Sequence, residues 1–143
     1  MSDDEVRALA EIRQRLAACT QAGDARKADA YAGSFTQDGV LELVNETISG
    51  REAIRAWMTA PSVIPAPKGG NPGFVSHHLT TCHVDFTGPD SATARTYWLV
   101  TSAAGLDHNG FYLDRLRRED GEWLLAHRRP RTLWVSPTSV LHA

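Results

Sequence analysis

The segment 74–86 places the tightest constraint on how this chain can fold. It is rich in β-branched and aromatic residues, and the turn signal Gly88-Pro89-Asp90 follows it, so it predicts a β-strand. Alternate residues of a strand share a face. We therefore expect two faces, with His77, Leu79, Thr81 and His83 on one and His78, Thr80, Cys82 and Val84 on the other.

The same segment holds three of the six histidines of the chain. One of the adjacent pair, His77 and His78, faces the interior whatever the register of the strand. The ordinary pKa of histidine lies near neutrality, so such a strand can support proton transfer in a pocket at physiological pH. A sheet histidine with a satisfied ring nitrogen and no catalytic role is the alternative interpretation.

The first part of the chain carries helical signals. Ser2 and Glu5 have the spacing of a capping box, and an apolar stripe at three- and four-residue steps continues from there to Gly23. A second helix is expected at 24–36 and a short strand at 40–44. Ser49-Gly50-Arg51-Glu52 repeats the capping-box spacing and opens a third helix, which Pro61 ends.

The later part of the chain carries strand signals. Segments 91–101, 111–118 and 122–129 predict three further strands, the last two joined by a two-residue hairpin turn at Asp120-Gly121. A chain with helices first and long antiparallel strands afterwards is typical of the α+β class. We divide a single domain, 1–143, into a helical part with a short strand (1–61), a loop (62–73), a four-stranded antiparallel part (74–135) and a tail (136–143). The Pro- and Gly-rich loop is either a lid over a site or a plain surface connection.

The hairpin predicts a second polar cluster. A two-residue turn pairs Leu116 with Leu125. On the same face it also pairs Asp114 with His127 and Tyr112 with Arg129. These four polar side chains form either a pocket wall or a solvated patch near the strand ends. A shift of one residue in the pairing would turn them to the opposite face.

Charge and composition exclude several classes of function. A net charge of −2 and a pI near 6.3 give no electrostatic case for nucleic acid or for an anionic membrane as partner. No apolar run approaches the ~20 residues of a membrane span, and the acidic start of the chain is unlike a secretory signal. We therefore expect a cytoplasmic protein, in which Cys19 and Cys82 remain thiols.

The strand that holds His77, Cys82 and His83 is not expected to bind a metal. His77 and His83 would lie ~20 Å apart at ~3.3 Å per residue, and Cys82 would face away from both. Zinc needs its ligands within ~2.3 Å of one point. The chain also has no phosphate-binding glycine loop, G-x-S-x-G elbow or dinucleotide fingerprint.

Several local patterns resemble one known family over residues 5–134. They are Phe35-Thr36-Gln37-Asp38-Gly39-Val40-Leu41-Glu42, Gly50-Arg51-Glu52-Ala53-Ile54, His77-His78-Leu79-Thr80-Thr81, Asp120-Gly121-Glu122-Trp123 and Ala126-His127-Arg128-Arg129. Together they resemble the SnoaL-like branch of the nuclear transport factor two superfamily, which is similar to scytalone dehydratase, bile-acid dehydratase, polyketide cyclases and hexachlorocyclohexane dehydrochlorinase. The resemblance implies a cone-shaped, cystatin-like barrel with N-terminal helices packed on a strongly curved, mostly antiparallel sheet.

The resemblance also implies a catalytic pair. Dehydratase-type members use an aspartate at the end of the first helix and a histidine that enters the third strand, and these match Asp24 and His77. His78 is the fallback for the base, because Thr81 stands where the family commonly has Asn. Asp24 would alternatively be the N-cap of the second helix. A three-residue insertion would instead put Gln21 at the position of the acid.

The function implied is that of a lyase of the dehydratase or cyclase type that needs no cofactor and no metal. In it Asp24 and His77 would abstract a proton from a mid-sized, apolar small molecule with a carbonyl or hydroxyl group. The remaining pocket residues would be hydrogen-bond donors and aromatic walls, drawn from Tyr112, His127 and Arg129 and from Trp57, Phe74 and Trp98.

Two other classes of function remain open, because this fold hosts many chemistries and some members that are not enzymes. One is a ligand-binding or assembly module, and the other is an isomerase or an epoxide hydrolase. A homodimer or higher homo-oligomer is also expected, because Cys82, Val84 and Leu99 are predicted on the outer face of the sheet, where a monomer would leave them in water.

Overall fold

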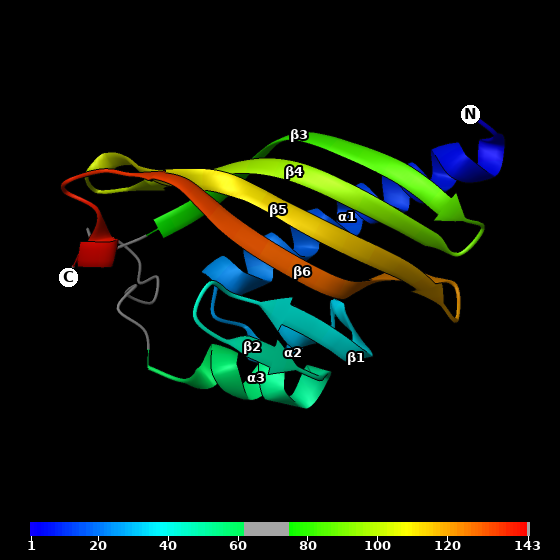
Figure 1. The fold of residues 1–143 in the computed structure, drawn as a ribbon, viewed down its shortest axis with the longest axis horizontal. Helices are drawn as coiled ribbons and strands as arrows, with labels where there is room; N and C mark the ends of the chain where they lie inside the picture. Colours follow the sequence, from blue (N-terminus) through cyan, green and yellow to red (C-terminus); the bar gives the residue numbers. More distant parts are fainter. Residues whose placement is uncertain (62–74, 143) are drawn as a thin grey trace.

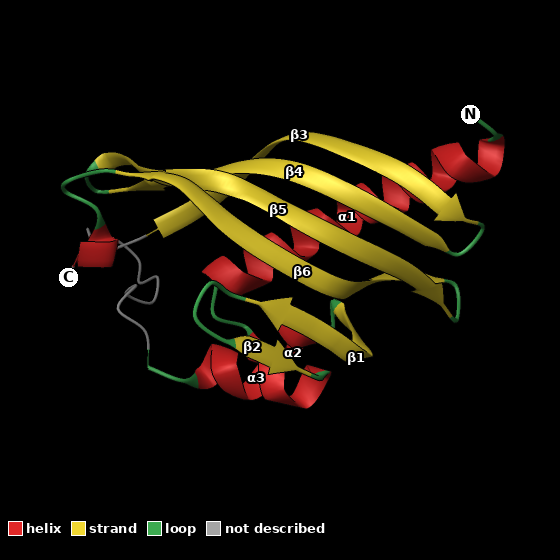
Figure 2. Ribbon diagram, viewed as in Figure 1, coloured by secondary structure: helices red, strands yellow, loops and turns green. Residues whose placement is uncertain are grey.

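One curved sheet of six strands organises the molecule, and three α-helices pack against it (Figure 1, Figure 2). The computed structural model describes residues 1–61 and 75–142, so Phe74 and the expected loop 62–73 lie outside the described residues. The elements in chain order are α1 (Asp3–Asp24), α2 (Ala28–Ala32), β1 (Phe35–Glu42), β2 (Thr47–Ser49), α3 (Arg51–Thr59), β3 (Val75–Gly88), β4 (Ser91–Ser102), β5 (Gly105–Glu119), β6 (Glu122–Val135) and the 3-10 helix η1 (Val140–His142).

The strand order is β2-β1-β6-β5-β4-β3. All neighbouring strands are antiparallel except β1 and β6, which run parallel. This arrangement confirms the predicted α+β class with its curved, mostly antiparallel sheet. The main core lies between α1 and the sheet and contains Ile12, Leu16, Phe35 and Leu125. No helix among the described residues is long and apolar enough to cross a membrane.

Helix α1 begins and ends on specific local signals. The predicted capping box is formed, because the Ser2 hydroxyl accepts from the Glu5 N–H and the Glu5 carboxylate accepts from the Ser2 N–H. At the other end Arg26 adopts a left-handed backbone with φ of 58°, and the Lys27 N–H bonds back to the Ala22 carbonyl. The helix therefore ends with Asp24 in its last turn.

The region after α1 differs from the expectation. The predicted helix at 24–36 shrinks to α2, Ala28–Ala32, because the reversal at Arg26 redirects the chain and Phe35 already pairs with β6. The predicted strand at 40–44 is consequently longer and begins earlier, as β1. The second capping box is not formed: Ser49 is still paired in β2, and the N-cap of α3 is Gly50, with a φ of 97° and no side-chain hydrogen bond.

A bulge in β3 changes which residues share a face. The pairing with β4 shifts between Leu79 and Cys82. His77 and Leu79 lie on the inner face as expected, but after the bulge Cys82 and Val84 pack against the core, and His83 is exposed. The predicted alternation is therefore wrong beyond Leu79. Two of the three apolar residues expected on the outer face belong to the core instead.

A second bulge lies in the hairpin of β5 and β6. The predicted turn at Asp120-Gly121 and the pairing of Leu116 with Leu125 are confirmed, but the register then shifts between Arg115 and Leu116. Beyond that point Asp114 pairs with Arg128 and Tyr112 with Pro130. The predicted pairs of Asp114 with His127 and of Tyr112 with Arg129 are therefore wrong, because one extra residue in β6 exchanges its two faces.

Candidate active site

A cavity of about 400 Å³ opens between the end of α1, helix α3 and the concave face of β3 to β6. Most of its wall is apolar or aromatic, and the residues that supply it are Tyr31, Leu41, Trp57, Met58, Val75, Trp98, Tyr112 and Leu141. Its polar groups include Asp24, His77, His108 and Arg128. Pockets of a few hundred Å³ with few polar groups are typical of sites for small organic molecules.

Asp24 and His77 meet at this cavity. Asp24 Oδ1 lies 2.6 Å from His77 Nδ1, and Asp24 Oδ2 accepts the backbone N–H of His77 at 2.8 Å. An ionised carboxylate only accepts hydrogen bonds, so Nδ1 carries the proton and Nε2 of the neutral ring is left as an acceptor. The two side chains are 20 % and 24 % exposed, respectively, which leaves the pair within reach of a ligand.

Two alternatives for this pair are wrong. Helix α2 has Lys27 as its N-cap, without a side-chain hydrogen bond, so Asp24 is not a helix cap. His78 lies on the outer face, where it is exposed and contacts the hydroxyls of Ser76 and Thr101. His78 therefore does not line the cavity, and His77 does.

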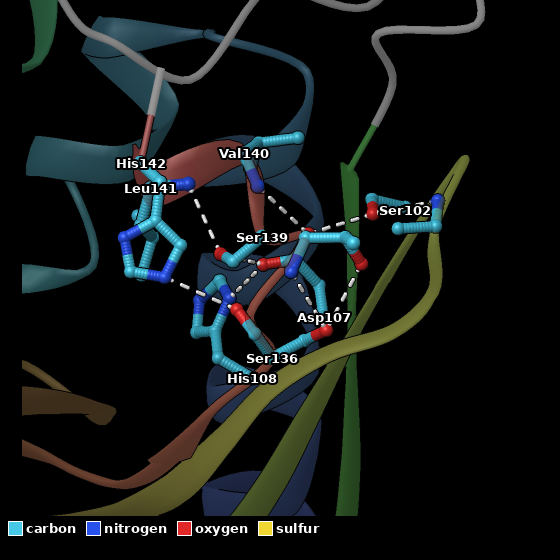
Figure 3. A network of polar contacts seen from close by, with 10 residues as sticks. Ser102, Asp107, His108, Ser136, Ser139, Val140, Leu141 and His142 are labelled. Carbon is cyan, nitrogen blue, oxygen red and sulfur yellow. Dashed lines mark hydrogen bonds and ion pairs between the residues drawn. The ribbon is translucent and has the colours of Figure 1, made fainter.

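His108 in the cavity wall belongs to a second aspartate–histidine pair, which the sequence analysis does not predict. Asp107 Oδ1 lies 2.7 Å from His108 Nδ1, and both side chains are buried (Figure 3). The His108 ring lies edge-on to the His77 ring, with 6.4 Å between the ring centroids, and 5.6 Å from the Trp98 ring. Residues 105–110, a polar run flanked by glycines, lie outside the strands expected at 91–101 and 111–118. In the structure they begin β5.

Beneath the cavity lies a fully buried ion pair. Arg128 donates from Nε and Nη2 to the two oxygens of Asp114, each at 2.9 Å, and both side chains are at most 2 % exposed. Burial alone would lower the pKa of Arg128, but the Asp114 carboxylate outweighs burial and raises that pKa well above its usual value. The guanidinium also stacks on Tyr112, 3.8 Å from the ring centroid. Burial raises the pKa of Tyr112 to about 12, so its phenol keeps its proton at neutral pH.

The remaining predicted pocket residues divide into three groups. Trp57 and Trp98 line the cavity. Gly110 lies opposite Trp98 on β5, and a Cβ there would come within 2.6 Å of the Trp98 ring. His127 and Arg129 do not line it. The β6 bulge turns them to the outer face, where each lies 3.8 Å from Glu42. Phe74 lies outside the described residues.

The arrangement can perform proton transfer in an apolar enclosure. A carboxylate holds Nδ1 of each of the two histidines, His77 and His108, which leaves their Nε2 atoms for a ligand. The phenol of Tyr112 and the guanidinium of Arg128 line the same cavity. Within residues 1–61 and 75–142, no group of three His, Cys, Asp or Glu side chains could hold a metal ion.

Comparison with known proteins places this architecture in a family. The sequence model of the SnoaL-like domain matches residues 4–129. No curated protein matches the sequence. Among solved structures, Rv3472, a protein of unknown function from Mycobacterium tuberculosis, is 26 % identical, with 98 % of this chain and 86 % of that chain covered and a TM-score of 0.81.

Two further solved structures share the fold at lower identity. A putative scytalone dehydratase from Novosphingobium aromaticivorans is 20 % identical over 95 % of this chain and 91 % of its own, with a TM-score of 0.78. A hexachlorocyclohexane dehydrochlorinase of LinA type 3 from Novosphingobium barchaimii is 17 % identical over 95 % and 94 %, with a TM-score of 0.77. Because the domain model matches residues 4–129, which is most of the chain, this chain belongs to the SnoaL-like domain family.

Proposed function

We propose that this protein is a cofactor-independent lyase that dehydrates or cyclises a mid-sized, largely apolar molecule with a carbonyl or hydroxyl group. The observation that carries the proposal is the Asp24–His77 pair, hydrogen-bonded at 2.6 Å and 2.8 Å at the edge of an apolar cavity of about 400 Å³. Two proteins of similar fold, described as a putative dehydratase and a dehydrochlorinase, carry names that denote eliminations, which favours the same reaction type here.

His77 is the general base of the proposed reaction. Its Nε2 removes a proton from a carbon next to the substrate carbonyl, because Nδ1 is committed to Asp24. The Asp24 carboxylate stabilises the positive charge that develops on the ring and holds the ring in place through the backbone N–H of His77. A positioned general base contributes about 10²–10⁴-fold to a rate.

His108 is the general acid of the dehydration. Hydroxide is a poor leaving group, so in its protonated form His108 delivers the Nε2 proton to the departing hydroxyl, which leaves as water. The electron pair of the broken C–H bond forms the new double bond as the C–O bond breaks. The ring centroids are 6.4 Å apart, so a water molecule returns the proton from His77 to His108 and completes the cycle.

Tyr112 stabilises the negative charge that develops on the carbonyl oxygen. Its phenol keeps its proton, since its pKa is raised to about 12, and it lines the same cavity as the two histidines. Preorganised donors of this kind are the largest single contribution to many enzymatic rates. Arg128 supports Tyr112 from below through the stacked guanidinium.

The experiment starts from the ligand that the protein itself selects. Small molecules released from purified protein are identified by mass spectrometry, and those with a carbonyl or hydroxyl group are assayed for loss of water or ring closure. His77→Ala is expected to lower turnover by about 10²–10⁴-fold. The matched control is His78→Ala, which alters the adjacent, outward-facing histidine and should retain turnover within about twofold.

Two results would contradict the proposal. Equal turnover by the wild type and by His77→Ala would show that His77 is not the general base. A ligand that is bound tightly, with an intact C–H bond and no turnover by the wild type, would instead identify a binding module.

A further inference from the structure

The carboxylate of Asp107 is fully buried and accepts four hydrogen bonds (Figure 3). Oδ1 accepts from the Ser139 hydroxyl and from His108 Nδ1 at 2.7 Å. Oδ2 accepts from the Ser102 hydroxyl at 2.7 Å and from the Val140 N–H at 3.0 Å. An ionised carboxylate offers about four acceptor positions, so these donors use the full capacity of Asp107.

These four donors keep Asp107 ionised, and the ionised carboxylate in turn fixes a proton on His108 Nδ1. Burial opposes ionisation of Asp107, but the hydrogen bonds from Ser139, Ser102 and His108 outweigh it and hold the pKa of Asp107 well below its usual range. Because the ionised carboxylate can only accept, His108 must carry its proton on Nδ1. With Nδ1 committed to Asp107, Nε2 is the ring atom that can take up a proton or release one to a ligand.

Two of the four donors, Ser139 and Val140, belong to the segment 136–142. The Ser136 N–H also bonds to the backbone carbonyl of Asp107 at 2.8 Å. Val140 packs on the apolar cluster of Val75, Trp98 and Val100, and Leu141 forms part of the cavity wall. The segment is therefore docked on Asp107, and its docking places Leu141 in the cavity wall.

We propose that Asp107 is a positioning residue that couples the docking of segment 136–142 to the tautomer and orientation of His108. The Oδ1 atom is shared by Ser139 and His108, so the carboxylate cannot turn toward one without losing the other. If the segment leaves, two buried acceptor positions lose their donors, and the carboxylate and the ring rearrange together. The catalytic consequence rests on the role of His108 in the proposed function, whereas the coupling itself is a structural property.

The coupling is tested without a substrate, by nuclear magnetic resonance on the full chain. The ring ¹⁵N signals of His108 report its tautomer, and hydrogen exchange of the Val140 amide reports docking of the segment. Asp107→Asn is expected to change the ring signals away from the Nδ1–H form and to raise Val140 amide exchange by about tenfold or more, because a charged acceptor is lost.

The informative comparison is between Ser139→Ala and Ser102→Ala, because each removes one hydroxyl donor from Asp107. Only Ser139 lies on the docked segment. Ser139→Ala is expected to raise Val140 exchange by about tenfold and to shift the His108 ring signals, whereas Ser102→Ala should change Val140 exchange by less than about threefold. Each variant removes a single hydroxyl, so this comparison decides the question even if Asp107→Asn fails to fold.

One outcome overturns the coupling: faster Val140 exchange in Ser139→Ala with unchanged His108 ring signals. Retention of the wild-type His108 tautomer in Asp107→Asn overturns the positioning role. These readouts remain decisive if the wild type has no turnover, which would contradict only the proposed function.

With an identified substrate, kcat adds a functional readout. Asp107→Asn should lower kcat more than it raises KM. In the His108→Ala background the same substitution should change kcat by less than about twofold, because the residue on which it acts is gone. An undiminished effect of Asp107→Asn in that background would contradict action through His108.

Discussion

The two aspartate–histidine pairs, each with its histidine in the cavity wall, have nearly the same hydrogen bond and very different surroundings. The carboxylate lies 2.6 Å from Nδ1 in the Asp24–His77 pair and 2.7 Å in the Asp107–His108 pair. Exposure separates them: the side chains of the first pair are 20 % and 24 % exposed, and those of the second are 0 % and 6 % exposed. Geometry within the pair therefore does not decide its role.

The donors around each carboxylate explain the difference. Within residues 1–61 and 75–142, Asp24 accepts hydrogen bonds from one residue, His77, through its ring and its backbone N–H. Asp107 binds donors from four residues on β4, β5 and the segment 136–142. The Asp24–His77 pair is therefore accessible to a ligand, whereas the Asp107–His108 pair is held in place by its surroundings. Substitutions should cost mainly activity at Asp24 and mainly stability at Asp107.

The largest loss of stability is expected at a third carboxylate, Asp114, which is fully buried and paired with Arg128. Arg128→Met leaves the Asp114 charge buried and unpaired, so the free energy of unfolding should fall by about 3–5 kcal/mol. Urea denaturation measures this. The double variant Arg128→Met, Asp114→Leu removes both charges and should recover most of the loss. Equal instability of the single and double variants would show that packing, and not the buried charge, is responsible.

Asp107→Asn should lower the free energy of unfolding by about 3 kcal/mol at pH 7, because the amide presents a donor to groups that themselves donate. The pKa of Asp107 is held low in the folded protein, whereas an unfolded aspartate titrates near about 3.9. Its contribution is therefore complete above that value and is lost as the pH falls toward the folded pKa. The gap between wild type and variant should therefore shrink below about pH 4. A gap that is independent of pH down to about pH 2 would contradict this.

Asp24→Asn should show the opposite balance. The stability cost is expected to stay below about 1 kcal/mol, because the side chain is partly exposed and the amide oxygen can still accept the His77 N–H. Turnover should fall by about 10²–10⁴-fold, because an amide donor facing Nδ1 favours the tautomer that has its proton on Nε2. Thermal melts and steady-state kinetics on the same sample separate the two effects. A large loss of stability with full activity would reverse the assignment of roles.

The smallest effect should come from Tyr112→Phe. No hydrogen bond to the phenol is recorded within the described residues, and the ring that stacks on Arg128 is retained, so stability should change by less than about 1 kcal/mol. Loss of one donor to the developing oxyanion should still lower kcat by about tenfold or more. An unchanged kcat would assign that donor to another residue of the cavity.

Strong local signals and the family resemblance allowed much of this molecule to be predicted from its sequence. The capping box of Ser2 and the hairpin turn at Asp120-Gly121 are formed as expected. The position of Asp24 at the end of the first helix, together with the inward face of His77, brings together the two residues that the resemblance had paired. Each of these depends on spacing within an unbroken element.

The errors in the faces of the sheet lie where a single extra residue interrupts a strand. On each side of a bulge the apolar and polar residues still alternate, but beyond it each residue points to the face opposite to the one that the alternation predicts. For this reason Cys82 was assigned to the wrong face, and His127 and Arg129 were expected in the pocket in place of Arg128. His108 was overlooked for a different reason: Asp, Asn and Gly around it are rare in strands, and tertiary pairing overrides that preference.

The central claim, that His77 removes a proton from a bound carbon acid, is tested most directly by deuterium incorporation. The ligand recovered from the protein is incubated with enzyme in D2O, and deuterium at the carbon next to its carbonyl is followed by mass spectrometry. The wild type and His78→Ala should incorporate deuterium at similar rates, and His77→Ala should do so at least about a hundredfold more slowly. Incorporation by His77→Ala at the wild-type rate would contradict the account.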